Sequence, residues 1–90
     1  MDVEQARARM RNYIADLNKR SDTPVRETGF EERIEGAWVF YWNSTEFLET
    51  GRFEVQLVGQ GPTLVMDDGT VHQGNSGERP AQVLARRPGI

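Results

Sequence analysis

The 90-residue chain contains no cysteine, only one histidine and no long apolar run. Without cysteine it can form neither a disulfide scaffold nor a thiolate metal site, which fits a reducing compartment. No apolar stretch approaches the roughly 20 residues that a membrane-spanning helix needs. The first residues carry neither the basic nor the apolar region of a secretory signal peptide. We therefore expect a cytoplasmic protein that does not bind a membrane.

Motifs for catalysis and for cofactor binding are also missing. The single histidine, His72, has only Asp67 and Asp68 near it in sequence, and a hairpin turn explains these carboxylates better than a metal site does. No serine lies in a nucleophile elbow. The stretches GQGP and GNSG lack the lysine of a phosphate loop and the strand–loop–helix setting of a dinucleotide site. We predict no catalytic residue, no cofactor and no metal, and hence a protein that is not an enzyme.

Acidic side chains concentrate in the middle of the chain, whose formal net charge is −3. Residues 26–54 hold seven glutamates against three arginines, and four of the eight aromatic residues lie within residues 38–42. A nucleic-acid-binding surface is instead a basic stripe interleaved with aromatic side chains. We therefore expect no nucleic-acid partner. An acidic centre suits a basic protein partner, because complementary charge steers the two proteins together.

Residues 2–20 have the periodicity of an amphipathic helix. Asp2 and Gln5 are spaced as a capping pair at its start, and the sequence Ser21-Asp22-Thr23-Pro24 ends it. Its apolar side chains fall on one stripe, formed by Val3, Ala6, Met10, Tyr13, Ile14 and Leu17.

Residues 25–74 predict a sheet of about five short strands. We expect strands at residues 25–34 (with Gly29 as a bulge), 37–42, 53–58, 63–67 and after a two-residue hairpin turn at Asp68-Gly69. The turn sets Met66 opposite Val71 and Val65 opposite His72. In the third strand, Phe53, Val55 and Leu57 alternate with polar residues and are predicted to point inward. The stretch from Gly59 to Pro62 is predicted to be a turn.

The aromatic stretch GAWVFYWNSTEFLETG, residues 36–51, divides into two predicted elements. Trp38, Phe40 and Trp42 share one face of a central strand, where they are expected to pack under the helix. After that strand, Ser44 is expected to cap a short helical turn that Gly51 ends.

Together these elements predict an α+β fold in which the N-terminal helix packs on one face of a mostly antiparallel sheet. We expect one domain over residues 1–90, with the helix at 2–20, the sheet at 25–74 and a short C-terminal tail at 78–90. Residues 79–87 are predicted to add one or two helical turns.

The sequence between residues 36 and 62 resembles the YrhB-like domain, also called the immunity protein 35 family. The residues that match its motifs are Gly36, Trp38, Val39, Phe40, Asn43, Ser44, Glu46, Phe47, Leu48, Glu49, Thr50, Gly51, Gly59, Gly61 and Pro62. The resemblance spans roughly residues 2–80. It implies a non-enzymatic bacterial protein that neutralises a cognate toxin, and one branch of the family is associated with chaperone-like behaviour.

Three function classes follow for this chain. The first is an immunity protein that binds a cognate protein toxin directly, as a monomer or a weak homodimer. The second is a chaperone-like holdase or regulatory accessory domain that binds unfolded or partner proteins. The third, a small hydrolase or metal-dependent enzyme, is disfavoured by the missing nucleophile and metal ligands. From exposure and charge, we predict that the partner-binding residues are Tyr41, Glu46, Glu49 and Glu54.

Overall fold

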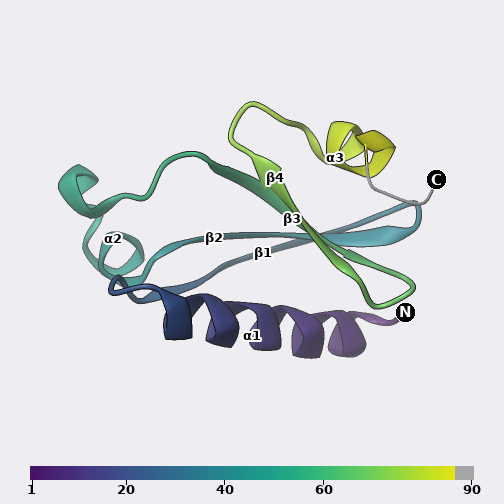
Figure 1. The fold of residues 1–90 in the computed structure, drawn as a ribbon, viewed down its shortest axis with the longest axis horizontal. Helices are drawn as coiled ribbons and strands as arrows, with labels where there is room; N and C mark the ends of the chain where they lie inside the picture. The colour runs from purple at the N-terminus through teal and green to yellow at the C-terminus, as the bar shows by residue number, and fades with distance from the viewer. Residues whose placement is uncertain (87–90) are drawn as a thin grey trace.

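The computed structural model describes residues 1–86, which form a four-stranded antiparallel sheet with a helix against each face (Figure 1). The elements are α1 (Val3–Arg20), β1 (Val25–Ile34), β2 (Ala37–Ser44), α2 (Thr45–Thr50), the 3₁₀ turn η1 (Phe53–Val55), β3 (Gln60–Met66), β4 (Val71–Asn75) and α3 (Pro80–Arg86). Strand order β1-β2-β3-β4 makes the sheet a meander. The predicted α+β class is confirmed, with four strands where about five were expected. The predicted C-terminal helical turns are present up to Arg86, and the rest of the predicted tail, residues 87–90, lies outside the described residues.

Helix α1 begins with the predicted capping box. The backbone N–H of Gln5 donates to Asp2 Oδ1 at 2.8 Å, and the Asp2 N–H donates to Gln5 Oε1 at 3.0 Å. Its apolar stripe packs on the sheet, where Ala6 and Met10 are fully buried against Phe40 of β2. The predicted packing of the aromatic strand under this helix is confirmed.

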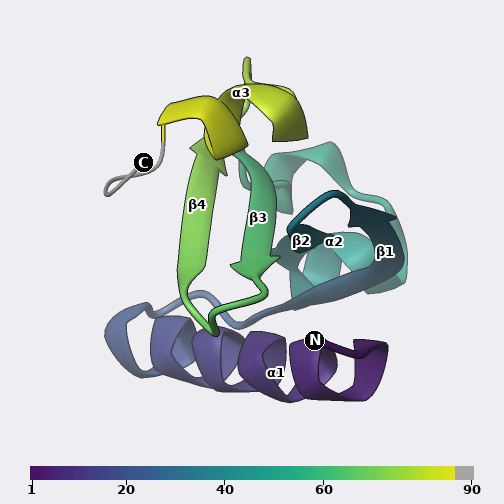
Figure 2. The same cartoon turned by 90° about the vertical axis from the view of Figure 1, so that its right-hand side faces the viewer.

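Alternate residues of the central strands supply a second core on the opposite face. Val39 of β2 and Leu64 of β3 point away from α1 and pack against Val83 of α3. Figure 2 shows α1 and α3 on opposite sides of the β3–β4 hairpin. The short C-terminal helix α3 therefore covers part of the sheet face opposite α1, for which the sequence predicted no covering element.

A bulge interrupts the edge strand β1 at the predicted glycine. Glu27 pairs with Trp42 and Glu31 pairs with Phe40, so residues 28–30 lie opposite Tyr41 alone. Gly29 has a φ of +95°, which a residue with a side chain adopts at a cost. Such bulges twist an edge strand and disfavour pairing with another chain.

The predicted strand at residues 53–58 is wrong. Phe53–Val55 form the 3₁₀ turn η1, and the backbone beyond it is extended but pairs with no strand. The physical reason is that the pairing of β2 with β3 stops at Phe40, and the side chains at the end of β2 take up this segment's backbone groups. Asn43 accepts from the Leu57 N–H at 2.8 Å and donates to the Leu57 carbonyl at 3.1 Å, and the Ser44 hydroxyl donates to the Val55 carbonyl at 2.6 Å.

The β3–β4 hairpin has a different register from the predicted one. Val65 pairs with Val71, and Leu64 with His72, because the loop contains three residues instead of two. The Met66 N–H donates to the Thr70 carbonyl at 2.8 Å, and Gly69, at φ +91°, donates its N–H to the Met66 carbonyl at 2.9 Å. This is the pattern of a turn closed by a glycine bulge. The Asp68 carboxylate favours the wider loop by accepting from the Thr70 N–H and hydroxyl.

The observed register places Gln73 beneath α1, at the centre of a polar network. Its Oε1 accepts from the hydroxyl of Tyr13 at 3.0 Å, the indole N–H of Trp42 at 2.9 Å and the hydroxyl of Thr63 at 2.6 Å. Its Nε2 donates to the Gly61 and Gly74 carbonyls. Within the described residues no buried side-chain polar atom lacks a partner. One glutamine thus ties the helix to three strands.

Gly61, predicted to lie in a turn, and Gly74 both belong to packed strands. β3 already begins at Gln60, and a Cβ on Gly61 would lie 2.0 Å from the Asn75 carbonyl oxygen. A Cβ on Gly74 of β4 would lie 2.6 Å from Val83 Cγ2. These glycines therefore permit close contact between β3, β4 and α3.

Candidate functional site

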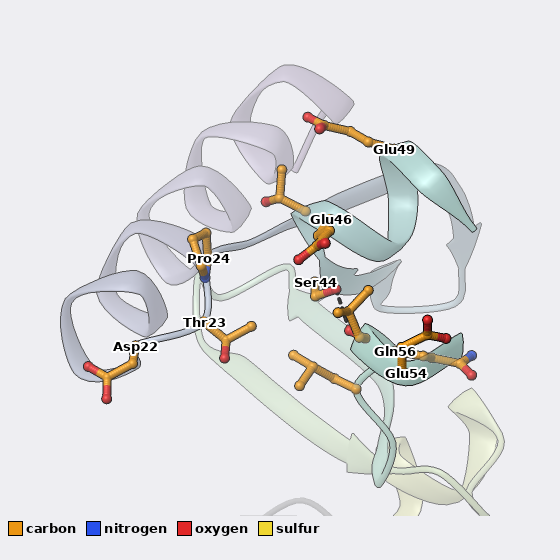
Figure 3. A pocket seen from close by; sticks show the side chains of 11 residues that line it. Asp22, Thr23, Pro24, Ser44, Glu46, Glu49, Glu54 and Gln56 are labelled. Carbon is orange, nitrogen blue, oxygen red and sulfur yellow. Dashed lines mark hydrogen bonds between the residues drawn. The ribbon is translucent and has the colours of Figure 1, made fainter. Parts of the chain in front are cut away.

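Three of the four predicted site residues surround one hollow. Glu46 and Glu49 on α2 and Glu54 on η1 line an opening of about 560 Å³, with Asp22 on its far side (Figure 3). Its other lining residues are Thr23, Pro24, Ser44, Thr45, Val55, Gln56 and Leu57. The structure thus brings the acidic residues of α2 and the adjacent turn η1 together with Asp22, which is distant in sequence.

Ser44 positions this hollow by making two contacts with one hydroxyl group. Its Oγ accepts from the Phe47 N–H at 3.0 Å, which caps α2, and donates to the Val55 carbonyl of η1. Gly51, at φ +73°, ends α2 and donates its N–H to the Phe47 carbonyl at 2.8 Å. The predicted cap and stop of this short helix are confirmed.

The charge around the hollow is negative. Arg52 is the one cation that contacts its acids among the described residues, with Nη1 3.2 Å from Glu46 and Nε 3.2 Å from Glu54. These groups are exposed, so solvent screens both pairs and neither holds the region rigidly. Four carboxylates face one guanidinium, and the hollow therefore attracts cations.

Tyr41, the fourth predicted residue, lies in a neighbouring groove. This groove of about 530 Å³ is lined by Tyr41 together with Thr28, Trp42, Asn43, Gln56, Leu57, Val58, Gly59, Gln60, Gly61 and Ser76. Gln56 and Leu57 line both depressions, so their segment forms a wall between them. We call residues 52–58 the ridge.

The ridge exposes two apolar side chains, one of which, Phe53, the sequence predicted to point inward. Phe53 is 79% exposed and Val58 is 84% exposed. The ring of Phe53 lies beside the ring of Phe47, with a centroid distance of 6.3 Å. The sequence does contain a signal that this segment leaves the sheet. A glycine flanks it on each side, Gly51 and Gly59, and both have a positive φ.

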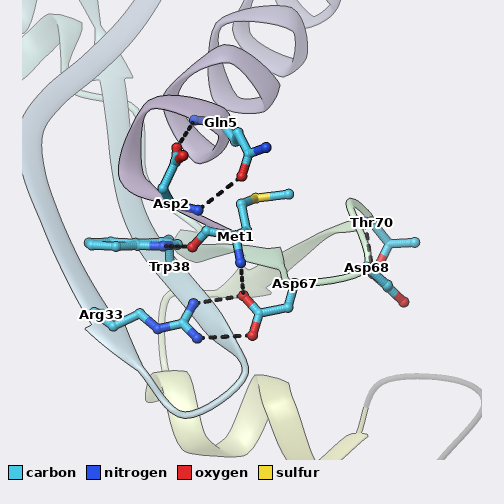
Figure 4. Close-up of polar contacts among 8 residues, drawn as sticks. All are labelled: Met1, Asp2, Gln5, Arg33, Trp38, Asp67, Asp68 and Thr70. Carbon is cyan, nitrogen blue, oxygen red and sulfur yellow. Dashed lines mark hydrogen bonds and ion pairs between the residues drawn. The ribbon is translucent and has the colours of Figure 1, made fainter.

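The other cluster singled out from the sequence is structural. Asp67 binds the Arg33 guanidinium through both carboxylate oxygens, at 2.7 and 2.9 Å, and the Met1 amino group lies 3.4 Å from it (Figure 4). These hydrogen bonds, with Arg33 dominant, lower the pKa of Asp67 to about 2. His72 lies beside Thr70, with its Nε2 3.2 Å from the hydroxyl. Among residues 1–86, no group of three or more histidine, aspartate or glutamate side chains is arranged to hold a metal ion.

None of the helices in the described part of the chain has both the length and the apolar character that crossing a membrane requires. Comparison with protein-family models matches residues 4–87 to immunity protein 35. Comparisons with curated proteins and with solved structures gave no match. The family match includes α1 from its second residue, every strand of the described sheet, α2 and the ridge. The chain therefore belongs to the immunity protein 35 family.

Proposed function

We propose that this protein neutralises a protein toxin by binding it directly, without catalysis. The observation that carries the proposal is the family match over residues 4–87. Immunity proteins as a group act on protein toxins, and a stoichiometric complex is the simplest way to block one. The proposal takes residues 1–90 as one domain that works in the cytoplasm, as the sequence predicted.

The surface around the ridge supports binding at one end of the molecule. The predicted contact residues Glu46, Glu49 and Glu54 lie on one side of the ridge, and Tyr41 lies on the other. Acid around exposed apolar side chains is suited to a protein partner, because charge speeds the encounter and apolar burial slows dissociation. These four contact residues are predictions that the experiments below test.

The chaperone-like alternative has no specific observation in its favour. It would use a broad apolar sheet face, and the aromatic face of β2 is covered by α1, with Phe40 fully buried. It remains a second prediction, which the same experiment separates from toxin binding.

The test is co-expression with the candidate toxin encoded beside the gene. We expect growth to be restored and a 1:1 complex to elute as a single species in size-exclusion chromatography with light scattering. Absence of a complex, combined with suppressed aggregation of unrelated unfolded proteins, would contradict toxin binding and favour the chaperone.

A further inference from the structure

We propose that the ridge, residues 52–58, is the principal toxin contact and that it docks on an apolar patch bordered by lysine or arginine side chains. This inference rests on the proposed function, and it adds the surface and the chemistry of its partner.

The large hydrophobic side chains that are exposed gather around the ridge. Within the described residues they are Phe53 and Val58 on the ridge and Phe30, 50% exposed, across the neighbouring groove. Phe30 contacts Tyr41 edge-to-face with ring centroids 5.4 Å apart, and Tyr41 lines the groove with Val58. Phe53 and Val58 lie on one short segment, and apolar side chains exposed together, unlike ones scattered singly, indicate an interaction site.

The acids beside the ridge specify the partner's charge. Glu54 lies on the ridge itself, and Glu46 and Glu49 on α2 border it across the acidic hollow. Arg52 already contacts Glu46 and Glu54, whereas no cation of the described residues lies within ion-pair distance of Glu49. A cationic rim on the partner would therefore be attracted, and an acidic rim would be repelled.

The ridge is held in place before any partner binds. Asn43 pairs with both backbone groups of Leu57, Ser44 binds the Val55 carbonyl, and Gln60 Nε2 donates to the Leu57 carbonyl at 3.1 Å. Four hydrogen bonds to two ridge residues limit the conformational entropy that binding would cost. The ridge is thus an ordered contact surface without being part of the sheet.

The test measures the affinity of purified variants for the toxin domain encoded beside the gene. Phe53→Ala is expected to weaken binding by about tenfold or more, mainly through faster dissociation. Glu49→Lys is expected to slow association and to reduce its dependence on salt. Glu35→Lys, the same charge change at an exposed position in the β1–β2 turn, is the matched control and should change the affinity by less than about twofold.

The outcomes separate the two proposals. A toxin domain that does not bind the wild-type protein overturns the proposed function, and this inference with it. Wild-type binding that neither Phe53→Ala nor Glu49→Lys alters, or that Glu35→Lys weakens as much, overturns the ridge alone. Thermal melts check that each variant is folded, and Val58→Ser repeats the apolar test at the most exposed of these side chains.

Discussion

At the scale of the residue, single polar side chains decide which segments meet. Gln73 collects hydrogen bonds from Tyr13, Trp42 and Thr63, and thereby joins α1 to β2, β3 and β4. Each of these three donors is at least half-buried. Removing the acceptor that they share would leave them without a hydrogen-bond partner and largely out of contact with water, which costs free energy.

Gln73→Ala is therefore expected to lower the free energy of unfolding by about 2–3 kcal/mol. Urea denaturation measures the change. Gln56→Ala, which truncates an exposed glutamine, should stay within about 0.5 kcal/mol of the wild-type value. Equal effects of the two variants would show that the network contributes little.

Because the pKa of Asp67 is lowered, the stability of the fold is expected to decrease as this carboxylate becomes protonated at low pH. Its pKa falls from 3.8 to about 2 in the folded protein, so its ion pair with Arg33 stabilises the fold above pH 3.8, and this contribution disappears as the pH falls toward 2. Wild type should exceed Asp67→Asn in melting temperature at pH 5, and the difference should shrink between pH 4 and 2. A constant difference over that range would contradict the assignment.

At the scale of the element, the backbone of the segment after α2 is hydrogen-bonded by side chains instead of by a neighbouring strand. The two-residue alternation of Phe53, Val55 and Leu57 is a genuine pattern, but a strand also needs a neighbour with free backbone groups. β2 pairs on both edges only from Ala37 to Phe40, and beyond Phe40 its side chains, not its backbone groups, bind this segment. Asn43 and Ser44 satisfy the segment's backbone groups instead, and Phe53 turns to solvent while Val55 and Leu57 are half-buried.

Asn43→Ala should release this segment without unfolding the sheet. The amide of Leu57, which donates to Asn43 Oδ1 at 2.8 Å, is expected to exchange with solvent about tenfold faster, which corresponds to ~1.4 kcal/mol. Asn12→Ala, at an exposed position on α1, should leave that amide unchanged. Unaltered exchange in Asn43→Ala would mean that other contacts hold the ridge.

The close packing of α3 against Gly74 gives a second prediction at this scale. Gly74→Ala would bring a Cβ to 2.6 Å from Val83 Cγ2 and 2.9 Å from the Pro62 carbonyl oxygen, so α3 must shift. We expect a loss of about 1–3 kcal/mol in the free energy of unfolding. Gly77→Ala is the matched control, because a Cβ there meets nothing within 4 Å, and it should be neutral in the same urea titration.

Local patterns in the sequence were enough to predict α1 with its capping box, the aromatic strand under it, the bulge at Gly29 and the cap at Ser44. Each depends on residues close to one another in sequence. The hairpin register was missed because a three-residue loop ending in Gly69 and a two-residue loop both contain Asp-Gly. The ridge was not predicted because its conformation depends on hydrogen bonds from Asn43, which lies 14 residues before Leu57.

At the scale of the whole molecule, the candidate contacts occupy one end of an elongated body. The described fold measures 38 × 26 × 22 Å, and α2 and η1 stand at one end of its long axis (Figure 1). An ordinary protein interface covers about 800 Å² on each partner. That is roughly a seventh of the molecule's 5652 Å² of accessible surface, so one end is large enough for a specific contact.

The claim that the ridge receives the toxin is tested most directly by hydrogen exchange of the protein with and without the toxin domain encoded beside its gene. We expect slower exchange of amides within residues 52–59 in the complex, with little change in the β1–β2 turn at residues 35–36. Slowed exchange confined to that turn or to α3, with residues 52–59 unchanged, would contradict it.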